Sequence, residues 1–137
     1  MDISRKPPLL TRVAAGIIIQ GGRVLVTRRG PMENLAGCWE FPGGKLEPQE
    51  SPEECVVREL REELSLTACA KEIIATSTYQ YPKGTIELIA IKCEVEDMNM
   101  SLTVHDEFQL LEPKALLDIN LAPADIEIAK KLGELYG

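Results

Sequence analysis

The segment SPEECVVRELREEL at residues 51–64 constrains the fold more than any other part of the chain, because it carries a complete helix-start signal. Ser51 suits the N-cap, Pro52 suits the first helical position, and Glu54 stands where it completes a capping box with Ser51. Apolar residues then recur at helical spacing, at Val56, Leu60 and Leu64. The pattern predicts an amphipathic helix from Ser51 to Leu64 that buries one stripe.

The same helix carries a cluster of glutamates on one side. Glu59 and Glu63 are i,i+4 neighbours, and Glu59 and Glu62 are i,i+3 neighbours, so their carboxylates lie close together. Each such pair of like charges costs roughly a few tenths of a kcal/mol. Arg58 can relieve part of this repulsion by reaching Glu62 or Glu54. Two interpretations stay open at this point: a solvated face with salt bridges, or a set of ligands for a cation.

The sequence FPGGK at residues 41–45, just ahead of the helix, favours the cation. Hard divalent cations such as Mg²⁺ take oxygen ligands from carboxylates, carbonyls, waters and substrate phosphates. The glycine pair lets the backbone approach closely and offer a carbonyl or amide where a Cβ would obstruct it. Lys45, Arg28 and Arg29 supply positive charge nearby. Together these residues indicate metal-assisted chemistry on a phosphoanhydride.

The rest of the chain predicts several strands in one globular unit. With 137 residues, 45% of them hydrophobic and 27% charged, the chain suits a single domain, which we place at residues 1–137. A glycine pair at Gly21-Gly22 predicts a hairpin, and the sequence PKG predicts a second tight turn. The runs rich in β-forming residues are 11–20, 21–29, 71–81 and 85–96.

Short elements and a final helix complete the predicted order. Residues 107–121 suggest a short strand followed by a short helix, and residues 30–44 are rich in turn residues and predict a loop. Helical spacing of apolar residues predicts a last helix, with Ile128, Leu132 and Leu135 facing the core. We therefore expect an α/β fold, an α/β/α sandwich in which a mixed β-sheet lies between helices.

The charge of the chain limits its partners. A formal net charge of −7 argues against a surface that follows a nucleic-acid backbone, because such surfaces recruit Lys and Arg. A small anionic substrate remains compatible if metal ions bridge the two. No apolar run approaches the roughly 20 residues that span a bilayer, and the sequence MDISRKPPLL lacks the apolar core of a signal peptide. We expect a cytoplasmic protein with no nucleic-acid or membrane partner, either a monomer or a homodimer.

The cysteines do not suggest a metal cluster or a redox motif. They are far apart in the sequence and none forms a C-x-x-C pair. We expect them to be small buried residues of a protein in a reducing compartment. The cysteines are Cys38, Cys55, Cys69 and Cys93.

The spacing of glycine, arginine and glutamates resembles the Nudix box, G-x5-E-x7-R-E-U-x-E-E-x-G-U, in which U is aliphatic. The matching positions are Gly44, Glu50, Arg58, Glu59, Leu60, Glu62, Glu63 and Leu66. Only the last glycine departs from the box, and Ser65 stands in its place. Around the box, AAGIIIQGGRVLVTRR and WEFPGGK resemble the MutT-type nucleoside triphosphate pyrophosphohydrolases. The sequence NLAPAD is similar to the bacterial CTP pyrophosphohydrolase and 8-oxo-dGTP diphosphatase group of that family.

The resemblance implies a set of metal ligands and supporting residues. Glu59, Glu62 and Glu63 would hold Mg²⁺, or Mn²⁺ in its place, together with the Gly43 carbonyl. Arg58 would orient a glutamate within this catalytic group. Gly44 and Glu50 would support the geometry between the loop and the helix, and Ser65 affects the turn after the helix without removing a ligand. Some members add a glutamate on a late loop, where VHDEF makes Glu107 the candidate ligand.

The resemblance also implies the reaction. Mg²⁺-dependent hydrolysis would convert a (deoxy)nucleoside triphosphate into the monophosphate and pyrophosphate, with Glu59 as first choice for general base. The substrates would be CTP, dCTP or an oxidised nucleotide such as 8-oxo-dGTP, which links the activity to nucleotide-pool sanitation and DNA repair. The expected substrate-binding residues are Arg28, Arg29, Phe41, Gly44, Lys45 and Asp125.

For the residues expected to bind the base, a purely structural role stays open as the alternative. Asp125 would accept hydrogen bonds from the amino edge of cytosine or guanine, or it is simply an acidic residue favoured at a helix N-terminus. Arg29 would lie near the base of the substrate, or it is a solvent-exposed residue at the end of a strand. Phe41 is favoured over Trp39 to line the pocket. His105, the only histidine, is expected to cap a loop without a catalytic role.

Two other functions remain in competition. The same chemistry could act on ADP-ribose or on a dinucleoside polyphosphate, and Tyr81 and Pro82 do not discriminate between these substrates and nucleoside triphosphates. A non-catalytic nucleotide-sensing domain belongs to a different class, and the intact set of glutamates argues against it.

Overall fold

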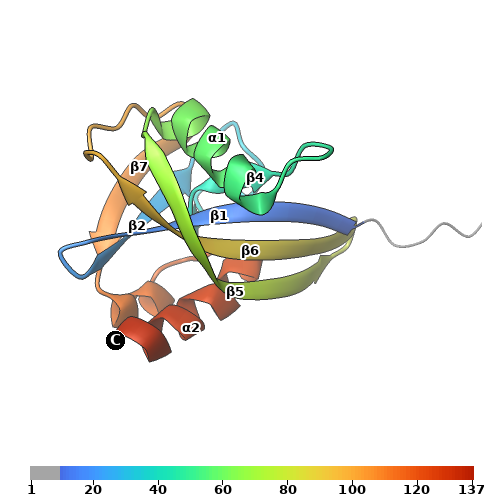
Figure 1. Cartoon of the computed structure of the whole chain (residues 1–137). Coiled ribbons are helices and arrows are strands. Elements are labelled where there is room, and N and C mark those ends of the chain that lie inside the picture. Colours follow the sequence, from blue (N-terminus) through green and yellow to red (C-terminus); the bar gives the residue numbers. More distant parts are fainter. Residues whose placement is uncertain (1–9) are drawn as a thin grey trace, which may run out of the picture.

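The computed structural model describes residues 10–137, so the prediction about a signal peptide in the sequence MDISRKPPLL falls, except for Leu10, outside the described residues. A sheet runs through the middle of the molecule, with one helix on each side (Figure 1). No helix within the described residues is long and apolar enough to cross a membrane. The elements are β1 Leu10–Gln20, β2 Arg23–Arg29, β3 Trp39–Glu40, β4 Gly43–Lys45, α1 Pro52–Leu64, β5 Ala68–Tyr81, β6 Gly84–Val95, β7 His105–Leu111, the 3-10 helices η1 Pro113–Asp118 and η2 Pro123–Asp125, and α2 Ile126–Tyr136.

The sheet is mixed, as predicted. Its strand order is β3-β2-β1-β6-β5, with β4 paired to β1 and β7 paired to β2. Only the pairing of β1 with β6 is parallel among the described strands, and all the others are antiparallel. β1 therefore lies between β6 on one side and β2 and β4 on the other. Its pairing with β4 places the glycine pair of β4 directly beside the core.

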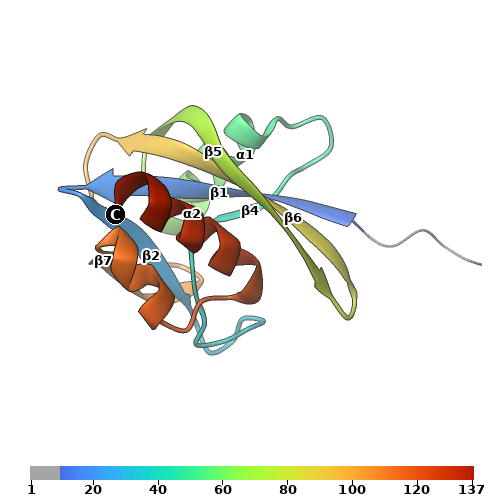
Figure 2. The same ribbon diagram turned by 90° about the horizontal axis from the view of Figure 1, so that it is seen from below.

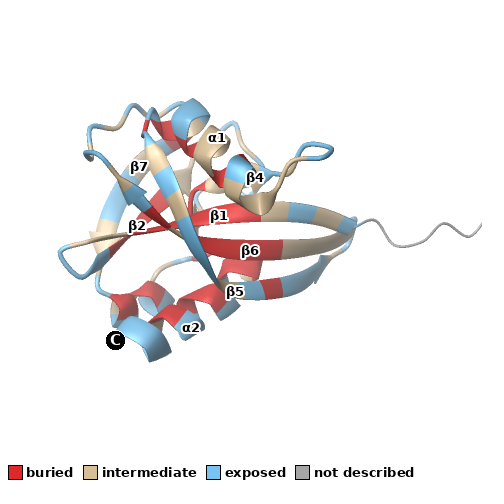
Figure 3. Ribbon diagram, viewed as in Figure 1, coloured by how far each residue is buried: buried red, intermediate tan, exposed pale blue. Residues whose placement is uncertain are grey.

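Two apolar clusters lie on opposite faces of the sheet and confirm the predicted sandwich. Because side chains alternate along a strand, Ala14 and Ile18 of β1 face α1, whereas Ala15 and Ile17 face α2. Figure 2 shows α2 crossing the face of the sheet opposite to α1. Buried residues follow the middle of β1, β2 and β6 in Figure 3. Burial of both faces is what holds this single sheet between two helices.

Helix α1 forms as its sequence predicts. The Ser51 side chain accepts a hydrogen bond from the Glu54 N–H, and the Glu54 carboxylate accepts one from the Ser51 N–H, which completes the capping box. The predicted stripe is fully buried. At the other end, Ser65 adopts the left-handed conformation, with φ of 57° and ψ of 29°, and its N–H donates to the last turn. Ser65 therefore takes the backbone geometry that favours glycine.

Three local predictions need correction. Residues 30–44 are not all loop, because β3 and β4 pair with β2 and β1 there, and strands of two and three residues leave no periodic pattern. The short helix after β7 is a 3-10 helix. Leu135, in the last turn of α2, is 51% exposed and does not face the core, whereas Ile128 and Leu132 are buried as expected.

The cysteine prediction is right in part. Cys55 and Cys93 are buried, and burial raises the pKa of the Cys55 thiol to about 11. Cys69, however, is exposed on β5, and Cys38, in the loop just before β3, is half-buried.

Candidate functional site

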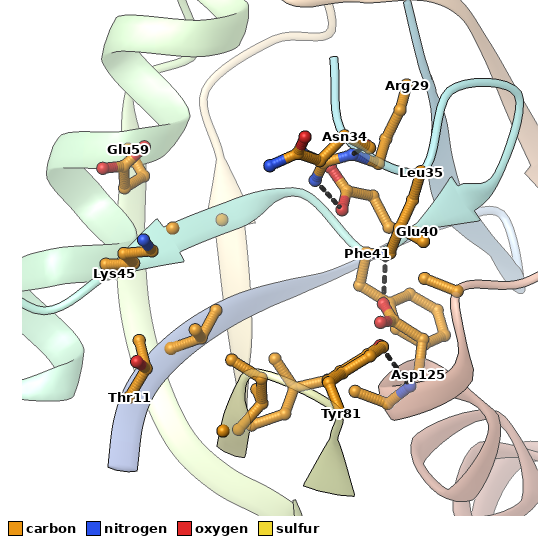
Figure 4. A pocket seen from close by; sticks show the side chains of 18 of the residues that line it. Thr11, Arg29, Asn34, Leu35, Glu40, Phe41, Lys45, Glu59, Tyr81 and Asp125 are labelled. Carbon is orange, nitrogen blue, oxygen red and sulfur yellow. Dashed lines mark hydrogen bonds and ion pairs between the residues drawn. The ribbon is translucent and has the colours of Figure 1, made fainter. Parts of the chain in front are cut away.

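A cleft of about 680 Å³ opens beside β4 and the C-terminal half of α1, from which Glu59 and Glu63 line it. Glu59 and Lys45 lie at one end of the cleft and Asp125 at the other, with Tyr81 on its floor (Figure 4). Residues of the β2–β3 loop, including Leu35, form part of the wall. One end of the cleft thus carries carboxylates and a lysine, and the other end is largely apolar. This arrangement suits a molecule with a charged group and a ring.

The glycine pair positions the acidic end. A Cβ on Gly43 would overlap the Ala14 carbonyl, so only glycine lets β4 pair this closely with β1. A Cβ on Gly44 would lie within 2.6 Å of both carboxylate oxygens of Glu59. The Glu59 carboxylate therefore sits against bare backbone of the turn. This close approach gives a physical reason for the glycine at each position.

Arg58 ties the glutamates together. Its Nε lies 2.8 Å from one oxygen of Glu50 and its Nη2 lies 2.9 Å from the other, so it grips Glu50 with two hydrogen bonds. Its Nη1 donates to Glu59 at 2.8 Å and to Glu62 at 3.2 Å. The hydrogen bonds from Arg58 lower the pKa of Glu50 to about 2. Of the two partners considered from the sequence, Arg58 reaches Glu62, while Glu54 is used by the capping box.

Glu63 is also largely buried, with 18% of its side chain exposed against 14% for Glu59. Burial, followed by the neighbouring carboxylates Glu59 and Glu40, raises the pKa of Glu63, and Arg29 offsets this only in part. Several carboxylates thus converge where there is too little positive charge to balance them. A divalent cation would supply that charge, so the donor set fits the oxygen-liganded ion expected from the sequence.

His105 lies next to Glu63, a position that was not predicted from the sequence. His105 begins β7, its side chain is fully buried, and its Nε2 lies 2.8 Å from Glu40 Oε2. The Arg29 Nη1 donates to the other oxygen of Glu40 at 2.8 Å. One ligand atom each of Glu40, Glu63 and His105 lies within 4.8 Å of the others. The prediction that His105 merely caps a loop is wrong, because the β2–β7 pairing places it opposite Arg29.

The apolar end of the cleft is built around Asp125. Its side chain is buried, and its Oδ2 accepts a hydrogen bond from the Phe41 N–H at 2.9 Å (Figure 4). Burial raises the pKa of Asp125 to about 8. Although Asp125 directly precedes α2, it makes no capping hydrogen bond. Its position at the N-terminus of α2 is the one that the helix-terminus interpretation expects, and Phe41, itself buried, lines the cleft beside it.

The remaining predicted residues divide between the cleft and its surroundings. Arg28 turns away to Asp106 and Glu107, at 2.8 and 3.1 Å, and lies over the Trp39 ring. Glu62 is 59% exposed at the side chain. Arg28, Glu62 and Glu107 are not among the described residues that line the cleft. The predicted residues that do line it are Arg29, Phe41, Gly43, Gly44, Lys45, Glu59, Glu63 and Asp125.

Comparison with known proteins places this geometry in a family. The model of the NUDIX domain matches residues 10–132. The chain is 38% identical over 121 residues to the CTP pyrophosphohydrolase of Escherichia coli (strain K12), covering 87% of this chain and 88% of that protein. It is 36% identical over 77 residues to the 8-oxo-dGTP diphosphatase of Proteus vulgaris, covering 56% and 69% of the two chains.

Solved structures agree in fold. The solution structure of the E. coli ORF135 protein superimposes with a TM-score of 0.80 at 35% identity, covering 94% of this chain and 95% of that one. The MutT protein from Methanosarcina mazei Go1 gives a TM-score of 0.85 at 22% identity, covering 95% and 97%. The second likeness concerns the fold alone, and both agree with the sheet and the two helices described above.

Proposed function

The chain belongs to the NUDIX family, and on that premise we propose that it hydrolyses (deoxy)nucleoside triphosphates to the monophosphate and pyrophosphate with the help of Mg²⁺. The observation that carries the proposal is a single cleft with carboxylates and Lys45 at one end and Asp125 beside Phe41 at the other. That arrangement suits a triphosphate joined to a base.

The acidic end would hold the metal and the phosphates. Glu59, Glu62 and Glu63, with the Gly43 carbonyl, are the proposed ligands of Mg²⁺ or Mn²⁺. A bound divalent ion supplies charge neutralisation of the phosphates and makes a water molecule more acidic. Lys45 lines the same end of the cleft and would attract the phosphate chain. Arg58 holds Glu50, Glu59 and Glu62 in place, so the ligands stand ready before substrate arrives.

Glu59 remains our candidate for the general base. Arg58 fixes its Oε1 at 2.8 Å, which leaves Oε2 to take a proton. Attack of water on an internal phosphorus forms one P–O bond and breaks the bridging P–O bond. The water proton passes to the carboxylate and then to solvent, and pyrophosphate leaves with the bridging electrons.

The other end would recognise the base. The Phe41 N–H occupies Oδ2 of Asp125, which leaves Oδ1 for the ligand. Because burial raises the pKa of Asp125 to about 8, the group is neutral near pH 7 and can donate as well as accept a hydrogen bond. Cytosine offers an acceptor, N3, beside a donor amino group, which matches a neutral carboxyl. We therefore propose CTP or dCTP as the first substrate class, in line with the name of the relative that matches most of the chain.

A second candidate is 8-oxo-dGTP, because several relatives carry the name 8-oxo-dGTP diphosphatase. Oxidised guanine also offers a donor beside an acceptor, at N7–H and O6, so a neutral Asp125 fits it as well. Activity on this nucleotide would make the protein an enzyme of nucleotide-pool sanitation, with DNA repair as the process it serves.

A substrate panel with Mg²⁺, scored for pyrophosphate against orthophosphate, tests the proposal. We expect pyrophosphate from CTP, dCTP or 8-oxo-dGTP. Activity confined to ADP-ribose or to dinucleoside polyphosphates would replace the proposed substrate class. Binding of nucleotides without any turnover would instead support a sensing domain.

A further inference from the structure

His105 is held in one orientation and one tautomer. Its Nε2 lies 2.8 Å from Glu40 Oε2, and the other oxygen of Glu40 accepts from Arg29 at 2.8 Å. A carboxylate engaged in this way accepts, so Nε2 carries the proton and donates it. The remaining ring nitrogen, Nδ1, then presents a lone pair.

That lone pair has no protein partner. Nδ1 of His105 is the one buried side-chain nitrogen or oxygen without a hydrogen bond among the described residues. Oε2 of the Glu63 carboxylate lies 3.7 Å from it. The lone pair of Nδ1 therefore faces a carboxylate oxygen of Glu63 without a hydrogen bond between them, whereas buried polar atoms are normally paired.

The separation of these two atoms indicates what fits between them. A distance of 3.7 Å is too long for a direct hydrogen bond. A bridging water with two hydrogen bonds of about 2.8 Å spans roughly 4.6 Å at a tetrahedral angle. Two ligands of one metal ion, each about 2.1 Å from it, stand roughly 3 to 4 Å apart. The gap thus matches a shared cation.

The chemistry of the pair selects the kind of cation. An imidazole nitrogen suits transition metals such as Zn²⁺, and Mn²⁺ accepts one more readily than Mg²⁺, which prefers an all-oxygen shell. Histidines that bind metals commonly donate their other ring N–H to a carboxylate, which is the relation of His105 to Glu40. The carboxylates of Glu40, Glu59 and Glu63 would surround the ion with negative charge.

We propose that His105 Nδ1 and Glu63 Oε2 form a position for a divalent transition-metal ion at the inner edge of the glutamate cluster, with Glu40 orienting the imidazole. The inference rests on the proposed function only through Glu63, which both sites would share. It implies that the protein binds Mn²⁺ through a nitrogen ligand and binds it more tightly than Mg²⁺.

The sequence makes this directly testable, since His105 is the only histidine of the chain. The experiment is pulsed EPR on tag-free, full-length protein loaded with one equivalent of Mn²⁺ in the absence of nucleotide. We expect a coupling to a directly bound ¹⁴N nucleus that is replaced by a ¹⁵N coupling when only histidine is ¹⁵N-labelled. Bound Mn²⁺ whose spectrum is unchanged by the label would overturn the inference.

Calorimetry on His105→Gln gives a second readout, with Glu134→Gln, at a side chain of α2 that is 72% exposed, as the control. We expect the Mn²⁺ dissociation constant to rise about tenfold or more in His105→Gln, the Mg²⁺ constant to change less than about twofold, and neither to change in the control. Equal weakening of both metals would contradict the proposal. If His105→Gln fails to fold, the labelling experiment on the unaltered chain decides.

The two proposals fail separately. A histidine coupling in a protein that hydrolyses no nucleotide would defeat the proposed function and support the transition-metal site. Hydrolysis of nucleoside triphosphates by a protein whose Mn²⁺ shows no histidine coupling would do the reverse.

Discussion

The Glu59 carboxylate occupies the space that a side chain on Gly44 would need: a Cβ on Gly44 would lie within 2.6 Å of both carboxylate oxygens. The turn before α1 and the acidic face of α1 are therefore one unit. The backbone of β4 packs against the carboxylate of Glu59, a proposed metal ligand. On the other side, Arg58 Nη1 donates a hydrogen bond to Glu59 Oε1 at 2.8 Å.

This contact makes a substitution at the turn a test of the acidic site. Gly44→Ala should displace the Glu59 carboxylate by about 1 Å and lower kcat roughly 100-fold, because a shift of that size in a catalytic group has such an effect. Gly133→Ala is the matched control, since a Cβ there meets nothing within 4 Å, and it should leave kcat unchanged. Steady-state hydrolysis and thermal melting check both. Full activity in Gly44→Ala would contradict the placement.

Glu63→Gln should separate catalysis from stability. Because burial and neighbouring carboxylates disfavour the charged form of Glu63, the neutral isostere should fold at least as well as the original residue. Turnover should fall by at least about 100-fold if Glu63 is a metal ligand. Glu134→Gln, at a side chain that is 72% exposed, serves as control. Retained turnover in Glu63→Gln would remove it from the ligand set.

Asp125 should govern the choice of base. Asp125→Ala removes both the donor and the acceptor that face the ligand, so KM should rise unequally among nucleotides. The largest rise should concern the preferred base, by about 10- to 100-fold, as expected for loss of a base contact worth about 1 to 3 kcal/mol. KM values for a panel of nucleoside triphosphates measure this. A uniform rise across all bases would exclude Asp125 from base recognition.

The raised pKa of Asp125 also predicts how stability depends on pH. Between its ordinary pKa of 3.8 and its value of about 8 here, the folded protein holds a proton that the unfolded chain has released. The contribution of Asp125 to stability is therefore complete below about pH 4 and is lost as the pH rises through about 8. Urea unfolding of metal-free protein should show a steeper loss for the original chain than for Asp125→Asn. Parallel curves for the two proteins would contradict the raised pKa.

Ser65 provides a prediction about stability alone. A serine with φ of 57° carries the cost of a left-handed backbone, which glycine largely avoids. Ser65→Gly should therefore raise the free energy of unfolding by about 1 kcal/mol and leave kcat and KM unchanged, because residue 65 does not line the cleft. Chemical denaturation measures the first effect and steady-state kinetics the second. A less stable variant would show that the Ser65 side chain itself stabilises the fold.

Features that depend on neighbouring residues in the chain were predictable. The capping box, the buried stripe of α1 and the glutamates on one side of it follow from helical spacing, and the structure has them as expected. The hairpin at Gly21-Gly22 likewise follows from local turn chemistry, and both glycines have positive φ.

Features that depend on strand pairing were not predictable. His105 reaches Glu40 because β7 pairs with β2 and places His105 opposite Arg29, while β3 pairs with the same strand. Nothing near His105 in the sequence encodes that register. The short strands β3 and β4 exist only because β2 and β1 offer them edges, and so the polar cluster behind Glu63 emerged from the fold alone.

On the proposed function, this cleft hydrolyses nucleoside triphosphates between internal phosphates with the help of a divalent metal. ³¹P NMR of the reaction of CTP, dCTP and 8-oxo-dGTP with the protein and Mg²⁺ follows that cleavage itself, with an EDTA-treated sample alongside. We predict that at least one of these nucleotides yields the monophosphate and pyrophosphate in equal amounts, and that EDTA stops the reaction. Release of orthophosphate with the nucleoside diphosphate, or undiminished turnover in EDTA, would contradict the claim.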